Sequence, residues 1–188
     1  MRLNPRIANS CQVLRLMTAV FALMLACAVQ ASAQSIDPFV GTYSGAVEVE
    51  IDGKVTQRDA SVEIEAHAPG FVVNWMTATR RSDGSVKTKS YSVNFQPTER
   101  DGVFGAAMRR NVFGKEVPLD PMKGEPYVWS RIVGETLTVF SIFVYDDGSY
   151  EIQQFDRTLV DGGLKLDFSS AKNGEIRRKL SAFLKRDS

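Results

Sequence analysis

The chain has 188 residues, of which 44% are hydrophobic and 24% are charged, and its formal net charge is +1. A near-neutral chain without a block of basic residues argues against a nucleic-acid partner. Cys11 and Cys27 lie in the N-terminal segment that we expect to be removed, and a single histidine without cysteine supplies too few ligands for a zinc site, so we expect no metal. No sequence motif implies a cofactor. His67 precedes Pro69-Gly70, and we expect it to be a solvated side chain beside a turn.

Residues 1–33 have the three parts of a secretory signal peptide. Their apolar run, 16–29, is shorter than the roughly 20 residues that a transmembrane helix needs. Ala31-Ser32-Ala33 is a small-residue cleavage signal. We therefore expect cleavage after Ala33 and export to the periplasm of a Gram-negative bacterium. The positive region before the apolar run holds three arginines and no acidic residue: Arg2, Arg6 and Arg15.

Anchoring as a lipoprotein at Cys27 is a minor alternative, because Leu25 is bulky where a small residue is usual. Cleavage after Ala33 would remove Cys11 and Cys27 and leave a net charge of −2. The remaining residues, 34–188, contain no long apolar segment, so we expect no membrane span in them. They are long enough to form one stable domain without disulfides.

From residue 41 onward the chain alternates apolar and polar residues between Gly- and Asp-rich turns. This period of two is typical of half-buried strands, and we find no convincing amphipathic helix. The pattern predicts an all-β fold, an antiparallel up-and-down meander barrel of about ten strands that occupies 34–188 as a single domain.

The first hairpin has the clearest register. Asp52-Gly53 is typical of a two-residue type I′ turn, which would place Ile51 opposite Lys54. Tyr43 would then face Val62, so that apolar residues meet across the pair. The same turn length at Asp83-Gly84 would pair Met76 with Tyr91 and point Trp75 outward, although a different loop length would reverse this.

The segment 110–126 is the least regular part of the chain. Its three prolines and two glycines exclude a central strand, yet it carries several large apolar residues. It is either a lid over a binding site or a loop that plugs one end of the barrel with its own side chains, and the two roles are compatible.

A two-residue turn at Asp147-Gly148 predicts a row of side chains across the late strands, from Val139 through Asp156 and Phe168 to Arg178. Gln154 lies on the same predicted face. Because a buried charge is costly unless paired, such a polar cluster inside a barrel needs a reason. Either Arg178 and Gln154 hold a ligand head group, or Asp156 and Arg178 satisfy each other.

The opening of the first strand, Phe39-Val40-Gly41-Thr42-Tyr43, resembles that of lipocalins and fatty-acid-binding proteins, the calycin-like barrels. In those families a Gly-x-Trp opens strand one and an arginine from a late strand packs near the aromatic ring. Tyr43 matches the ring here, and Arg178 is the expected arginine. The chain departs from the pattern in having Tyr for Trp, no disulfide, no room for a helix pair after strand one, and about ten strands. The resemblance implies an internal cavity for a small, mostly apolar ligand.

We therefore expect an exported protein that binds a small apolar or amphipathic molecule and is not an enzyme, since no nucleophile motif, metal spacing or phosphate loop is present. The alternative is an envelope structural or interaction protein with a filled barrel and a protein partner. The predicted ligand-binding residues are the aromatic Tyr43, Phe143 and Phe168, with Arg178, Asp156 and Gln154 at the polar end.

Overall fold

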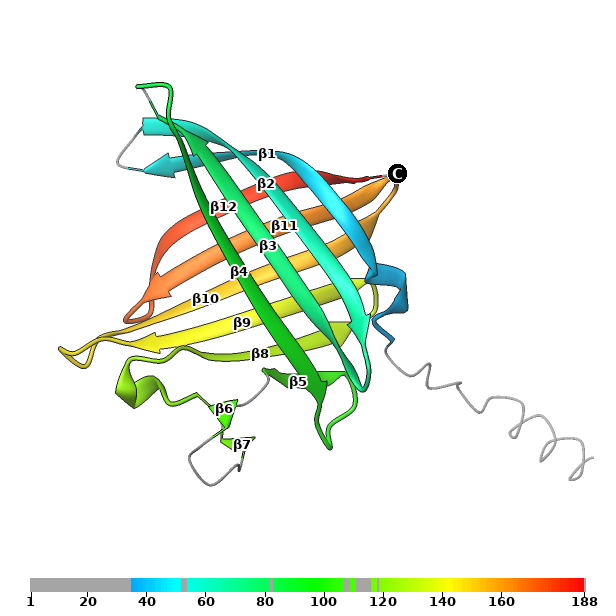
Figure 1. The fold of residues 1–188 in the computed structure, drawn as a ribbon. Coiled ribbons are helices and arrows are strands. Elements are labelled where there is room, and N and C mark those ends of the chain that lie inside the picture. Colours follow the sequence, from blue (N-terminus) through cyan, green and yellow to red (C-terminus); the bar gives the residue numbers. More distant parts are fainter. Residues whose placement is uncertain are drawn as a thin grey trace, which may run out of the picture. The chain divides into compact units, whose positions relative to one another are not determined.

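The computed structural model describes residues 35–51, 54–81, 83–106, 109–110, 116–117 and 119–187. These residues form a closed antiparallel barrel in which each strand pairs with its neighbours along the chain and β1 pairs with β12 (Figure 1). The predicted meander of about ten strands is thereby confirmed. The barrel strands are β1 (Gly41–Ile51), β2 (Lys54–His67), β3 (Gly70–Arg80), β4 (Val86–Pro97), β5 (Val103–Ala106), β8 (Tyr127–Val133), β9 (Thr136–Val144), β10 (Tyr150–Val160), β11 (Gly163–Lys172) and β12 (Glu175–Arg186).

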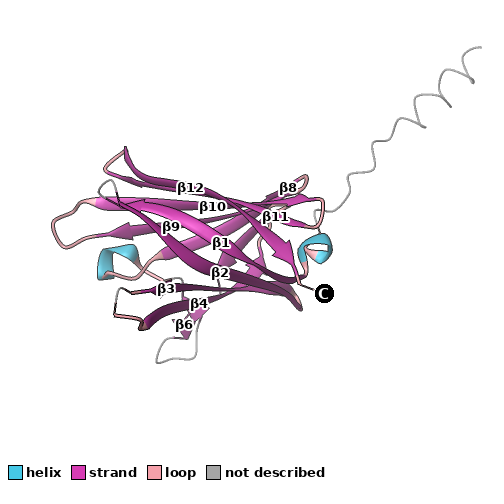
Figure 2. Ribbon diagram, turned by 90° about the horizontal axis from the view of Figure 1, so that it is seen from above, coloured by secondary structure: helices cyan, strands magenta, loops and turns pink. Residues whose placement is uncertain are grey.

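The remaining described elements are short. A two-stranded ribbon pairs β6 (Arg109–Arg110) with β7 (Glu116–Val117). Two 3-10 turns, η1 (Asp37–Phe39) and η2 (Pro121–Lys123), lie at opposite ends of the barrel (Figure 2). No helix among the described residues is long and apolar enough to cross a membrane. The predicted signal peptide and most of the segment 110–126 lie outside the described residues.

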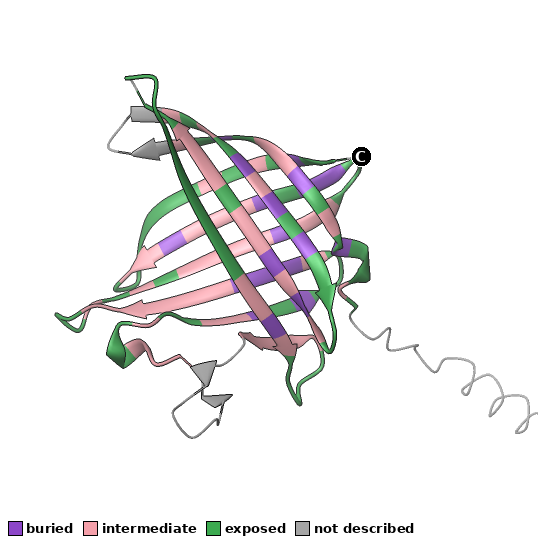
Figure 3. Cartoon of the chain, in the orientation of Figure 1, coloured by how far each residue is buried: buried purple, intermediate pink, exposed green. Residues whose placement is uncertain are grey.

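The hydrophobic core lies towards the end of the barrel that holds η1, which we call the closed end. Its inward-facing side chains are almost fully buried, and Phe71 stacks on Phe95 with 5.1 Å between ring centroids. The opposite end, with the loops 81–85 and 145–149, we call the open end; there most positions are half-buried or exposed (Figure 3). The core residues at the closed end include Phe39, Tyr43, Ile64, Phe71, Val73, Phe95, Leu137, Leu164 and Leu184.

Tyr43 and Arg186 close this end of the barrel. The Arg186 guanidinium carbon lies 5.2 Å from the Tyr43 ring centroid. Its Nη2 shares two N–H groups among three acceptors, the Tyr43 hydroxyl (2.6 Å) and the carbonyls of Pro38 and Val40 (3.0 Å each). The Tyr43 hydroxyl in turn donates to the carbonyl of Phe39 (2.9 Å). The late-strand arginine beside the first-strand aromatic ring is therefore Arg186.

The prediction that Arg178 fills this place is wrong, because Arg178 lies at the other end of the same strand. The backbone conformation at residue 41 explains why a glycine lies two residues before Tyr43. Its φ of +148° is rarely adopted by other residues, and a Cβ there would lie 3.4 Å from Nε of Arg186.

The first hairpin has the predicted register, with Ile51 opposite Lys54 and Tyr43 opposite Val62. The next hairpin does not. Trp75 pairs with Tyr91 and points into the barrel, whereas Met76 points outward. The loop between β3 and β4 spans five residues, 81–85, and is closed by a hydrogen bond from the Arg81 amide to the Ser85 carbonyl (2.8 Å). Five residues in place of two reverse the faces of the paired strands.

The wall of the barrel is incomplete beside β4. The short β5 contacts β4 only through Phe95–Pro97 and contacts β8 only through Trp129–Arg131. Among the described residues, no strand lies beside this edge of β4 from Val86 to Asn94. Tyr91 points inward and is nevertheless 51% exposed, so the interior is open to solvent along this side.

Candidate functional site

The interior of the barrel is not filled at the open end. A cavity of about 300 Å³ lies between β1–β4 and β10–β12, and a second of about 470 Å³ lies against β8–β10. The two adjoin, because both are lined by Trp75, Tyr91, Gln153 and Phe155. Their volumes fall at the lower end of the range of small-molecule sites. Together they form the candidate site.

The smaller cavity, which we call the cationic cavity, has an unbalanced charge. Five cationic residues line it and none of its described lining residues is acidic. Its apolar lining comes from inward-facing residues such as Val47, Ala60 and Leu166. The five cations are Arg58, Lys89, Arg157, Arg178 and Lys179.

Arg157 is the largest fully buried side chain of the described barrel, with 1% of its surface exposed. Its Nε and Nη1 atoms have no hydrogen-bond partner. The guanidinium carbon lies 5.9 Å from the Trp75 ring centroid and 5.6 Å from that of Phe155. Burial lowers the pKa of the guanidinium to about 10, although the charge of neighbouring Asp156 acts in the opposite direction. Arg157 therefore remains charged at neutral pH.

The second cavity is lined by aromatic rings, and we call it the aromatic cavity. Trp75 stacks on Tyr91 with 5.3 Å between centroids, and Phe143 meets Tyr145 edge-on at 4.8 Å. Ser141 on β9 also lines this cavity, and its small side chain takes up little of the volume. This cavity suits an apolar or aromatic body.

A polar cluster lies where the two cavities meet the rim of the open end. Glu151 accepts hydrogen bonds from Tyr145 (2.8 Å), Gln153 (2.9 Å) and Arg178 (3.1 Å). Burial raises the pKa of Glu151, but these hydrogen bonds and the charge of Arg178 outweigh burial and hold the pKa below its ordinary value. The hydrogen bond to Glu151 raises the pKa of Tyr145. Glu151 is thus ionised at neutral pH and already accepts three hydrogen bonds.

Three of the six predicted site residues line the cavities. Phe143 borders the aromatic cavity, and Phe168 and Arg178 border the cationic one. Arg178 lies 5.8 Å from the Phe168 ring centroid and also contacts Ser170 (3.4 Å). Tyr43 instead belongs to the core of the closed end.

Asp156 and Gln154 are not inside the barrel, contrary to the prediction. On β10 the residues that share the inward face are Glu151, Gln153, Phe155 and Arg157, and Phe155 pairs with Phe168. Asp156 accepts from Thr138 (2.6 Å) and Gln154 (2.7 Å) on the outer face, so that its charge is satisfied there. The predicted network between Asp156 and Arg178 does not form.

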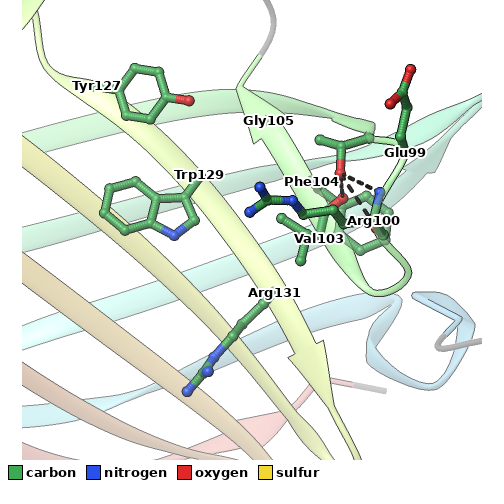
Figure 4. A pocket seen from close by; sticks show the side chains of 9 residues that line it. Glu99, Arg100, Val103, Phe104, Gly105, Tyr127, Trp129 and Arg131 are labelled. Carbon is green, nitrogen blue, oxygen red and sulfur yellow. Dashed lines mark hydrogen bonds between the residues drawn. The ribbon is translucent and has the colours of Figure 1, made fainter.

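A shallow depression of about 700 Å³ lies on the outside of the barrel, between the β4–β5 loop and β8. Tyr127, Trp129 and Arg131 project from β8 along one side of it, opposite Arg100 (Figure 4). Trp129 also stacks on Phe140 of β9, with centroids 5.0 Å apart and planes 15° apart. Three aromatic rings thus lie side by side on the outer face here: Tyr127, Trp129 and Phe140.

No protein-family model matches the sequence. No curated protein is significantly similar to it. The closed ten-strand antiparallel barrel is consistent with a calycin-like fold. The site must therefore be interpreted from its own geometry.

Proposed function

We propose that this protein binds a small amphipathic molecule inside the barrel. The observation that carries the proposal is the unfilled interior at the open end, where a cationic cavity adjoins an aromatic one. A structural barrel of this size gains stability by filling its interior with apolar side chains, and cavities lower that stability. An interior that combines apolar walls with a few polar groups is typical of ligand sites.

The ligand would lie with its apolar body against Phe143 and Phe155 and its polar end in the cationic cavity, which Arg178 borders nearer the rim. The incomplete wall beside β4 leaves the interior accessible from the side. Binding without catalysis is part of the proposal, because the polar residues that line the described cavities offer a head-group site.

Native mass spectrometry tests the proposal. We expect the protein, purified under non-denaturing conditions from its native host, to carry a reproducible small-molecule adduct. Ser141→Trp places an indole in the aromatic cavity and should remove the adduct, whereas Thr88→Trp, on the exposed outer face of β4, should retain it. Wild-type protein without an adduct in independent preparations would contradict the proposal. An adduct that persists in Ser141→Trp would place the ligand elsewhere.

Export to the periplasm belongs to the same proposal and rests on the pattern of residues 1–33. The intact mass of the same preparation tests it. A chain beginning at Gln34 would support a cleaved signal, and a lipid on Cys27 would support anchoring instead. A chain that retains residues 1–33 would contradict both.

A second candidate function is that of an envelope interaction protein, and the outer depression favours it. Tyr127, Trp129 and Phe140 form a continuous row of rings on the outer face, with centroid separations of 5.8 and 5.0 Å. Exposed aromatic residues with an arginine are typical of protein interfaces. Trp129→Ala should weaken capture of a protein partner without affecting a small-molecule adduct, and an unchanged set of partners would remove this candidate.

A further inference from the structure

The cationic cavity lacks the negative charge that would balance it. Its five cations include Arg58, whose Nε is buried without a partner, as are two nitrogens of Arg157. The nearest inward-facing carboxylate, Glu151, belongs to the aromatic cavity and is already bonded to three side chains. The described protein therefore supplies no anion to the deep part of this cavity.

Burying an unpaired guanidinium is unfavourable. A buried charge costs several kcal/mol unless it is paired and hydrogen-bonded. The rings of Trp75 and Phe155 offset only part of this cost, since a cation–π contact is weaker than an ion pair that is also hydrogen-bonded. The rings also provide no hydrogen-bond acceptor for the N–H groups of Nε and Nη1, which point outward in the plane of the guanidinium. An apolar residue of similar volume at this position would give a more stable free protein.

We infer that the ligand carries an oxyanion head group, a carboxylate or a phosphate monoester, which binds the guanidinium of Arg157. The inference rests on the proposed function and names the chemical class of its ligand. The planar fork of an arginine matches two oxygens of such a group, and charge-assisted hydrogen bonds are strongest where water is excluded. A neutral or cationic head group would leave the buried nitrogens of Arg157 and Arg58 without an acceptor.

The neighbouring groups fit the same ligand. Arg58 on β2 lies across the cavity and adds a second buried donor, and Arg178 lies nearer the rim with 47% of its side chain exposed. Arg178 already contacts Glu151, so Arg157 is the stronger candidate for the head group. The apolar body then extends past Phe155, which lines both cavities, towards Phe143.

A series of probes with one chain and different head groups tests the inference. Binding of decanoate, decyl phosphate, decan-1-ol and decyltrimethylammonium to the purified protein would be measured by calorimetry. We expect one or both anions to bind at least about thirtyfold more tightly than the alcohol, and the cation to bind most weakly. The two anions distinguish a carboxylate ligand from a phosphate one.

Variants then assign the head group to a residue. Arg157→Met replaces the guanidinium with an apolar side chain that is also long and unbranched. It should weaken anion binding by about thirtyfold or more, while decan-1-ol binding is retained. The free Arg157→Met protein should melt no lower than wild type, because an unpaired buried charge has been removed. Arg177→Met is the matched control, since Arg177 is exposed and paired with Glu175. It should bind all probes as wild type does.

Each outcome separates the two levels of the proposal. Equal binding of anions and alcohol by wild type would overturn the oxyanion inference and leave the cavity-binding proposal standing. Binding of none of the probes, together with adduct-free protein, would remove both. Head-group selectivity that survives in Arg157→Met would move the anion site away from Arg157. If Arg157→Met fails to fold, the selectivity of wild type still decides the ligand class.

Discussion

Replacing Arg186 by alanine should destabilise the closed end of the barrel. The guanidinium contacts two backbone carbonyls and the Tyr43 hydroxyl, and it also packs on the Tyr43 ring. Arg186 is partly open to solvent, so each polar contact contributes roughly 0.5 kcal/mol and the ring contact about 0.5–1 kcal/mol. The expected loss in the free energy of unfolding is about 2 kcal/mol. For a chain of this size that corresponds to a fall in melting temperature of about 4–8 °C.

Equilibrium urea unfolding, followed by tryptophan fluorescence, measures this loss. Arg178→Ala is the informative comparison, because Arg178 was the arginine expected from the sequence to pack on Tyr43. Arg178 contacts Ser170, Glu151 and Phe168, and its side chain is 47% exposed, so its loss should cost less than about 1 kcal/mol.

The reasoning would be refuted if Arg186→Ala unfolded within about 0.5 kcal/mol of wild type. It would also be refuted if Arg178→Ala cost more than Arg186→Ala. A double-mutant cycle with Tyr43→Phe then isolates the hydroxyl contact, which should couple the two residues by roughly 0.5 kcal/mol or more.

Two further predictions concern strand contacts and the rim. Gly70→Ala should destabilise the barrel by about 3 kcal/mol or more, because the new Cβ would overlap the carbonyl of Phe95. Gly105→Ala should be nearly neutral, since only a methyl group of Thr98 lies within 4 Å of the new Cβ. Thermal melts of the two variants test this difference. The pKa of Glu151 is held below its ordinary value, so its contribution to stability is present at neutral pH and is lost as the pH falls below 4.5. The difference in unfolding free energy between wild type and Glu151→Gln would be measured by urea unfolding between pH 7 and pH 3. It should shrink as the pH falls, and a constant difference would contradict the assignment.

The fold class followed from the sequence because strand alternation and turn residues are local signals. The first hairpin illustrates this: a two-residue turn flanked by matching apolar residues has only one register that buries Tyr43 and Val62 together. The inward faces of β1 and β2, with Tyr43 opposite Val62, were thereby predicted correctly.

The faces of the middle strands could not be predicted, because one assumption about loop length decides them. The turns at Asp83-Gly84 and Asp147-Gly148 were predicted to be two-residue loops. In the structure these loops have five residues each, 81–85 and 145–149. In each, the aspartate side chain accepts from the amide of the serine that follows the glycine, from Ser85 to Asp83 (2.9 Å) and from Ser149 to Asp147 (2.9 Å). The serine after Asp-Gly is the available signal, since Lys54 occupies that place in the true two-residue turn.

This change of parity explains the errors in the site. An odd difference in loop length turns every residue of the following strand to the other face. Asp156 and Gln154 therefore moved outside, and Arg157 and Gln153 moved inside. Phe168 nevertheless lies inside as predicted, because it pairs with Phe155 in place of Asp156. The bulge between Ser170 and Ala171 keeps Arg178 on the same face.

Stability and proposed binding are divided between the two ends of the barrel. At the closed end the buried Tyr43 has its hydroxyl satisfied and the interior is filled. At the open end two buried nitrogens of Arg157 lack hydrogen-bond partners, in a cavity whose described lining residues include cations but no acidic side chain. A well-satisfied core can tolerate such a local cost, and a site that is unfavourable when empty becomes favourable when an oxyanion occupies it. It follows that substitutions at the closed end should change the melting temperature of the free protein more than its selectivity, and that Arg157→Met should do the reverse.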